Sequence, residues 1–255
     1  MKNNKKSLLL FCLLLFAFFS NAQQIFLTAG KIEFEKKVNL IKNIEDDMQD
    51  DENNSWLNEI KKTLPEYFVS YFDLFFDENK TLYKPGKENP VPQKINEWIK
   101  GPARDNIVYK DFELQKCTTQ KNAFEATFLV QDSVRKVDWK ITNDTRTIAG
   151  IDCRKAVAII MDSIYVVAFY TDEIIATGGP ESFNGLPGMI LGIAIPRIHT
   201  TWFATKIETL KPTAQDLTAP TKGKKVTNEQ LVQQLKTTMK DWGKGGQRIQ
   251  WAILL

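Results

Sequence analysis

Residues 179–191 place three glycines and two prolines immediately before an apolar run. The five residues are Gly179, Pro180, Gly185, Pro187 and Gly188. Glycine reaches backbone angles that strain other residues, whereas proline fixes φ and has no N–H to donate. Pro187 followed by Gly188 is typical of a type II turn, and the residue before a proline is pushed into an extended conformation. A chain that uses both residue types in one short loop therefore requires one particular backbone path there.

Most of the chain beyond residue 22 has the pattern of β-strands. Residues 31–38 alternate with period two and place Ile32, Phe34 and Val38 on one face. Residues 66–76 are rich in aromatic side chains, and the turn residues that follow them predict a hairpin. Residues 151–171 predict a second hairpin. Further strands are expected at residues 112–117, 124–130 and 201–210.

Helical patterns are few and short. One helix is expected at residues 56–63. A second begins at Thr227, where Gln230 completes a capping box, and it ends at Gly243. Closely spaced strands with few helices between them favour antiparallel pairing, so the predicted fold class is mainly β (α+β). We expect a curved antiparallel sheet backed by one or two helices, in one domain that spans residues 23–255.

The first 22 residues have the pattern of a signal peptide. Three lysines precede an apolar segment, residues 7–19, that is too short to span a bilayer. Small residues at positions 20–22 predict cleavage before Gln23, with an uncleaved anchor as the alternative. No second apolar stretch is long enough to cross a membrane. We therefore expect an exported protein, periplasmic or associated with the outer membrane, that is not an integral membrane protein.

The net charge of the chain comes from this leader. The sequence has 34 Lys and Arg against 31 Asp and Glu, and the leader contributes three of the lysines and no acid. After cleavage the two counts are equal. A neutral chain offers no electrostatic attraction for nucleic acid, so a nucleic-acid partner is not expected.

Two cysteines, Cys117 and Cys153, follow the leader. Because an exported chain meets an oxidising compartment, a disulfide between them is one interpretation. Two separate buried thiols are the other. Cys153 shares a strand face with Ile151 and Val157, whereas Cys117 falls on a more polar face, and disulfide geometry cannot be derived from sequence.

An ordered set of motifs resembles the GLPGLI family of exported Bacteroidetes proteins. The set comprises residues 139–142, 148–156, 169–174, 179–180 and 185–191. Met189 stands where the family name has Leu, and both side chains are apolar. The resemblance implies an extracytoplasmic β-rich domain and carries no catalytic residues, because none are established for that family.

The residues themselves predict little chemistry. His199 is the only histidine, and it lies in a turn without an evident nucleophile or base to act with. One histidine and two distant cysteines offer no transition-metal site, and no glycine loop for phosphate is present. Acidic residues at positions 45–47 and 50–52 lack the spacing of a calcium loop and are expected to be a solvated segment. We therefore expect no metal, no cofactor and no catalytic residue.

Two features have both a structural and a functional interpretation. The aromatic residues of 67–76 predict either core packing or a concave sheet face that accepts a ligand. In the glycine-rich loop, Leu186, Met189 and Ile190 are either buried or form an apolar patch that contacts a ligand or partner. The explicit turn chemistry favours the structural interpretation of the loop.

These observations predict a non-enzymatic binding or accessory protein of the Gram-negative cell envelope, serving an outer-membrane partner. A carrier that holds an apolar ligand, lipid-like or peptide, in the concave face of the sheet is the first alternative. A hydrolase that uses carboxylates alone is the second, and it requires two carboxylates that face each other in a cleft.

We predict that the exported protein begins at Gln23. The basic start, the short apolar segment and the small residues at positions 20–22 together direct cleavage there. N-terminal sequencing of the protein recovered from the envelope fraction checks this, and an intact Met1 on membrane-bound protein would contradict it.

Overall fold

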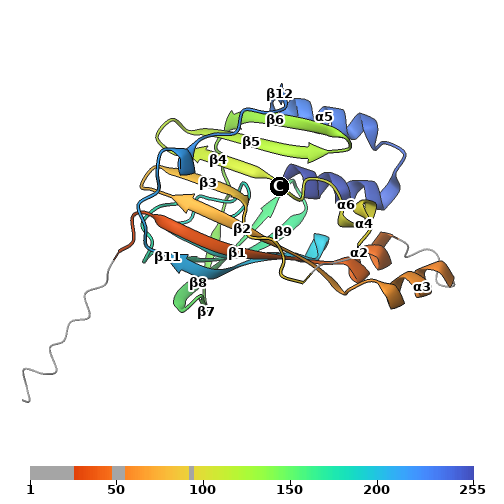
Figure 1. Ribbon diagram of the computed structural model, residues 1–255, viewed down its shortest axis with the longest axis horizontal. Coiled ribbons are helices and arrows are strands. Elements are labelled where there is room, and N and C mark those ends of the chain that lie inside the picture. Colours follow the sequence, from red (N-terminus) through yellow and green to blue (C-terminus); the bar gives the residue numbers. More distant parts are fainter. Residues whose placement is uncertain (1–25, 48–54, 92–94) are drawn as a thin grey trace, which may run out of the picture.

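The computed structural model describes residues 26–47, 55–91 and 95–255 (Figure 1). The predicted signal peptide, its cleavage site and the acidic residues 50–52 lie outside the described residues. The described helices are all too short or too polar to cross a lipid bilayer.

Within these described ranges, twelve strands form one sheet in the order β12-β6-β5-β4-β3-β2-β1-β11-β10-β9-β8-β7. Their bounds are β1 Gly30–Asn39, β2 Tyr67–Phe76, β3 Lys80–Pro85, β4 Ile107–Asp111, β5 Lys116–Ala123, β6 Ala126–Ser133, β7 Lys140–Ile148, β8 Ile151–Ile160, β9 Ile164–Thr171, β10 Met189–Ile195, β11 Thr200–Glu208 and β12 Lys224–Val226. Neighbouring strands pair antiparallel, except that β12 runs parallel to β6. The β2–β3 and β8–β9 hairpins confirm the two predicted from the sequence.

In the described part of the chain, seven short helices connect or cover the strands. They are α2 Leu40–Asp47, α3 Ser55–Thr63, α4 Glu97–Lys100, α5 Asn228–Thr238 and α6 Gly243–Leu254, with the 3₁₀ turns η1 Pro196–Ile198 and η2 Gln215–Leu217. The capping box of Thr227 and Gln230 is present, and Leu231 and Leu235 are buried, as the sequence predicted. The predicted end of this helix at Gly243 is wrong, because α5 ends at Thr238 and Gly243 begins α6. The glycines of α6 disfavour a helix, so its sequence does not predict one.

The sheet curves, and its concave face carries the core. Ile32 and Phe34 of β1 and Phe72 of β2 belong to the same buried cluster as Tyr170 of β9 and Ile193 of β10. The aromatic residues of β2 therefore divide by face, since Phe72 and Phe76 are buried and Tyr67 is exposed. Helices α5 and α6 cover the β5–β6 end through a second cluster that includes Phe128, Leu235 and Ile253 (Figure 1). The predicted fold class is confirmed: a mainly β chain with a curved, mostly antiparallel sheet.

The concavity of the sheet is filled by the chain itself. Residues 174–188, between β9 and β10, contribute Phe183 and Leu186 to the core, and Leu255, directly after α6, also belongs to it. Loop and helix therefore occupy space in the concave face that the carrier hypothesis assigns to an apolar ligand, and that hypothesis stays a prediction.

The glycine-rich loop has the role that the turn chemistry favoured. Leu186, Met189 and Ile190 are at most 3% exposed, so they do not form the apolar contact patch considered above. Gly185 and Gly188 have φ of 91° and 131°, conformations that side chains with a Cβ rarely adopt. The backbone path requires these glycines, and the apolar run enters the core as β10.

The two cysteines are free thiols in the structure. Cys117 is the second residue of β5, because residues 112–115 of the expected strand 112–117 form the turn between β4 and β5. Cys153 lies in β8, and seven strands separate it from β5 in the sheet order. Burial raises the pKa of the Cys153 thiol to about 12. The disulfide interpretation is not supported, because each cysteine belongs to a different region of the sheet.

We predict that Gly188→Ala destabilises the fold far more than Gly150→Ala. An added Cβ at Gly188 would overlap the Thr171 carbonyl oxygen, whereas Gly150 also has positive φ but no atom near its Cβ position. Gly150→Ala should therefore cost about 1–2 kcal/mol of backbone strain alone, and Gly188→Ala several kcal/mol. Urea unfolding of both variants measures the difference. Equal losses would show that the close approach at Gly188 does not constrain the fold.

We predict that both cysteines are free but differ in reactivity. Cys117 is partly exposed and Cys153 is buried, so a thiol reagent should label Cys117 in the folded protein and both after unfolding without reductant. Mass spectrometry of the labelled protein counts the thiols. Absence of labelling after unfolding would show that a disulfide joins the two.

Candidate functional site

A pocket of about 90 Å³ lies at the end of the concave face where β1, β2 and β11 meet the helices. The strands contribute Lys36, Val38, Phe68, Thr200 and Trp202, the helices α2, α4 and α6 contribute Asn43, Ile99, Lys100, Arg248, Ile249 and Ala252, and the segment after α4 contributes Pro102, Ala103 and Arg104. Pockets that enclose a whole drug-sized ligand have at least roughly 300 Å³. This pocket can therefore take one small group of a larger ligand.

A buried ion pair forms the polar end of the pocket. Glu181, from the loop between β9 and β10, is 1% exposed, and its Oε1 lies 3.4 Å from Lys36 Nζ. Its Oε2 accepts a hydrogen bond of 2.9 Å from Asn106 Nδ2. The Lys36 ammonium also lies 5.0 Å from the centroid of the Trp202 ring. Because both partners are desolvated, the pair is weak evidence for stability but holds each charge in a defined position.

A second buried lysine holds the backbone of the same loop. Lys110 Nζ donates hydrogen bonds to the carbonyl oxygens of Gly179, Glu181 and Phe183, at 3.0, 2.9 and 2.8 Å. Burial lowers the pKa of Lys110 to about 8. Lys110 itself does not line the pocket, so it affects the pocket indirectly, by holding the backbone of Glu181.

Two further cations hold the carboxyl end of α6, which forms the opposite wall. Lys121 Nζ donates to the Ile253 carbonyl oxygen at 2.6 Å, and Arg135 Nη2 donates to that of Leu254 at 2.5 Å. Cations at a helix C-terminus satisfy carbonyl groups that lack helical partners. Burial lowers the pKa of Lys121 to about 8 as well.

Asn43 of α2 brings an unsatisfied acceptor to the pocket. It is 6% exposed, and its Oδ1 has no hydrogen-bond partner among the described residues. A buried acceptor without a partner costs about 1–3 kcal/mol. The polar end of the pocket therefore has an ion pair and an unsatisfied acceptor. Its walls include apolar side chains such as Val38 and Ile249 and the basic side chains of Arg104 and Arg248.

The residues singled out for other chemistry lie elsewhere. His199 Nε2 lies 2.8 Å from Asp46 Oδ2, and Arg248 pairs with Asp47, so the acidic residues that end α2 have basic partners. Glu45 pairs with Lys61. Within residues 26–47, 55–91 and 95–255, no three His, Cys, Asp or Glu side chains are grouped to hold a metal ion.

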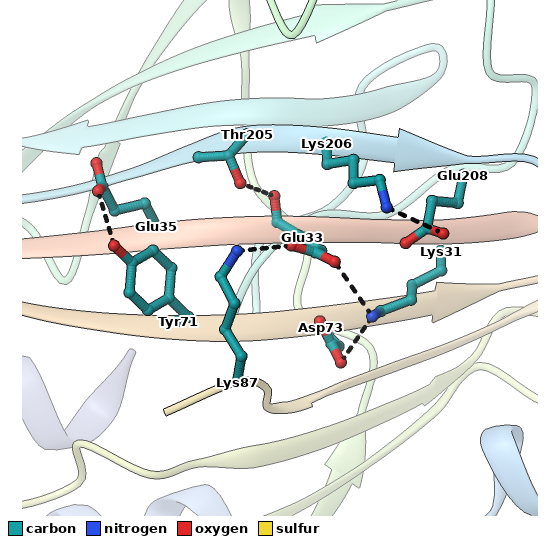
Figure 2. A network of polar contacts seen from close by, with 9 residues as sticks. All are labelled: Lys31, Glu33, Glu35, Tyr71, Asp73, Lys87, Thr205, Lys206 and Glu208. Atoms are coloured by element: carbon teal, nitrogen blue, oxygen red, sulfur yellow. Dashed lines mark hydrogen bonds and ion pairs between the residues drawn. The ribbon is translucent and has the colours of Figure 1, made fainter. Parts of the chain in front are cut away.

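The outer face of the sheet carries a separate polar network. Figure 2 shows Lys31 of β1 paired with Glu33 and Asp73, while Glu33 also pairs with Lys87. A hydrogen bond from Lys87 lowers the pKa of Glu33. Each pair in the network joins a positive and a negative side chain, and surface ion pairs of this kind contribute about 0–1 kcal/mol each to stability. We therefore assign this network to the sheet surface and the candidate site to the pocket around Glu181.

Comparison with known proteins identifies a related family. The family model described as "N-glycanase peptide, N-terminal domain" matches residues 91–233, which is more than half of the chain. A search of curated proteins found no match. The matched segment contains Glu181, Lys110, Lys121 and Arg135.

Two solved structures of PNGF-II, in space groups P21 and C2, share the fold. Their TM-scores are 0.51 and 0.50, at 15% and 14% sequence identity. Each alignment covers 86% of this chain but only 34% and 33% of the PNGF-II chains. The chain therefore spans about a third of the length of those structures.

The resemblance to the GLPGLI family was wrong. The matching family model is that of the N-glycanase N-terminal domain, and it includes the segment 139–191 on which the resemblance rested. The physical reason lies in the turn, because Gly185 and Gly188 are required by positive φ. Such glycine and proline spacing reports a backbone path that unrelated chains can share.

Proposed function

The chain belongs to the family of N-glycanase N-terminal domains, and we propose that it is an exported, non-catalytic module that binds N-glycosylated peptides. Export is supported by the signal-peptide pattern of residues 1–22. The choice of ligand class is supported by the family name, which links the domain to N-glycanases. Location in the envelope of a Gram-negative cell and service to an outer-membrane partner stay predictions.

The observation that carries the proposal is the unsatisfied Asn43 acceptor beside the Glu181–Lys36 pair. Asn43 Oδ1 is buried, so the side chain must rotate into the pocket before a hydroxyl or amide N–H of a ligand can satisfy this acceptor, while the Lys36 ammonium can donate to a ligand oxygen. The apolar walls, among them Val38, Phe68 and Ile249, suit a methyl group or the apolar face of a sugar. Glycosylated peptides offer all of these groups within a few ångströms of each other.

Binding without catalysis is supported by the arrangement of the carboxylates. Carboxylate-based glycoside hydrolysis uses two such groups on opposite sides of the scissile bond. Among the described residues that line the pocket, Glu181 is the one carboxylate, and both its oxygens already contact Lys36 and Asn106. The pocket therefore does not support the hydrolase alternative.

We predict that Asn43→Leu weakens binding without destabilising the fold. The change removes the unsatisfied Oδ1 acceptor. It should lower the affinity for a short N-glycosylated peptide about three- to tenfold, which is the effect of one hydrogen bond. Because a buried unsatisfied acceptor is also removed, the melting temperature should stay equal or rise. Calorimetric titration and thermal unfolding measure the two effects.

The matched control is Asn143→Leu in the edge strand β7, where the side chain is exposed and is not part of the pocket lining. It should leave the affinity unchanged. The same peptide without its glycan tests the ligand class, and it should bind more weakly than the glycosylated form. Equal binding of both peptides, or unchanged affinity in Asn43→Leu, would show that the proposal is wrong.

A further inference from the structure

The loop that carries Glu181 has a backbone conformation that its sequence does not favour. Glu181 has φ of 52°, in the left-handed region, which costs a non-glycine residue about 1–3 kcal/mol. A turn bond from Phe183 N to the Pro180 carbonyl oxygen, at 3.2 Å, closes the segment. Such a conformation persists only where its surroundings impose it.

The contact that holds the loop in this conformation is made by the Lys110 ammonium. The carbonyl groups of three alternate residues, Gly179, Glu181 and Phe183, converge on its Nζ within 3.0 Å. An ammonium group is the side-chain donor with three N–H bonds on one nitrogen, so it satisfies all three carbonyl groups at once. A neutral amine retains only two N–H bonds and presents a lone pair to the third oxygen.

The loop is also closely packed, so its path and the direction of Glu181 are linked. A Cβ added at Gly179 would lie 2.8 Å from Ile190 Cβ, which leaves the backbone no room on that side. Trp139 Nε1 donates to the Asn184 carbonyl oxygen at 2.8 Å and holds the other end. A change in the contacts of Lys110 therefore moves the Glu181 side chain relative to Lys36 and Asn106.

We propose that Lys110 is a positioning residue of the pocket: its ammonium sets the backbone of residues 179–183 so that Glu181 holds Lys36 at the polar end of the pocket, where Lys36 can donate to the ligand. This inference rests on the proposed function for its ligand, but its claim about the loop can be tested without one. Lys110 acts through Glu181 and does not contact the ligand.

The charged and titratable groups that face Lys110 determine how it responds to pH. They are Glu181 in the loop, Cys117 on β5 and Arg135 beyond β6. Tyr83 of β3 adjoins Glu181, and burial raises its pKa well above 10, so it stays neutral. Lys110, with its pKa lowered to about 8, loses its proton in mildly alkaline solution. The third carbonyl group is then released.

The signature of this role is that binding and stability respond to pH in opposite directions. A lysine whose pKa is lower in the folded than in the unfolded chain makes the unfolding free energy rise with pH between the two values, here from about 8 to 10.5. Lys121 adds an effect of the same sign. Ligand affinity should fall over the range in which Lys110 loses its proton, about three- to tenfold for one lost hydrogen bond.

The experiment measures hydrogen exchange of the full chain without ligand from pH 6.5 to 10. Protection factors, corrected for intrinsic exchange, should fall near pH 8 for the amides of residues 181–184 but not for those in the centre of β1. In parallel, calorimetric titration follows the affinity for the N-glycosylated peptide. The Cys117→Ser variant should behave like the unchanged protein, because the thiol is not the group that responds.

The outcomes separate the two proposals. Constant protection of residues 181–184 across this pH range would overturn the role of Lys110, whether or not the peptide binds. Absence of peptide binding at pH 7 with an alkaline loss of protection would keep the positioning claim for the loop and reject the proposed function. In Lys110→Met, protection should be low and independent of pH. If that variant does not fold, the unchanged protein and Cys117→Ser decide the question.

Discussion

The fold depends on one requirement, which is that irregular backbone buried inside a curved sheet must find hydrogen-bond donors. A loop normally runs over the surface, where water satisfies its carbonyl groups. Here residues 174–188 fill part of the concavity, and side chains take the place of water as hydrogen-bond donors. Lys110 serves three carbonyl groups, and Trp139 and Thr177 serve those of Asn184 and Leu186. Burying a lysine is costly, but leaving three carbonyl groups unsatisfied would cost more.

The same requirement determines where a ligand can bind. Loop and helix fill much of the concavity, and a pocket among the described residues lies at its end, lined by Glu181, Lys36 and Asn43. The buried cations therefore have a double effect. Lys110 fixes the loop that presents the carboxylate, and Lys121 and Arg135 fix the end of α6 that forms the facing wall. A pocket built this way is preorganised, and preorganisation lowers the cost of ordering its side chains on binding.

The sequence predicted the elements whose pattern is local and missed the contacts that join distant segments. The alternation of residues 31–38, the β2–β3 hairpin and the capping box at Thr227 each depend on neighbours in the chain, and all three are present. The contact of Lys110 with Glu181 spans 71 residues and left little trace. One signal existed in the strand pattern. Lys36 lies on the same face of its strand as Phe34, and Lys110 lies on the same face as Val108. An apolar residue is expected at such buried positions. A lysine in that phase indicates a buried partner, but the partner cannot be named without the fold.

The glycine-rich loop shows why a conspicuous motif misled the family assignment and yet marked the site. Gly188 is fixed because a Cβ would collide with the backbone of Thr171, a condition that any chain turning back onto a strand in this way must meet. The motif thus describes a path and says little about ancestry or chemistry. The chemistry of such a loop differs between proteins, because it depends on the side chains that the loop carries. In this chain it brings Glu181 from seven residues upstream of Gly188 into contact with Lys36 and Asn106, so chemical identity resides in the residues between the glycines.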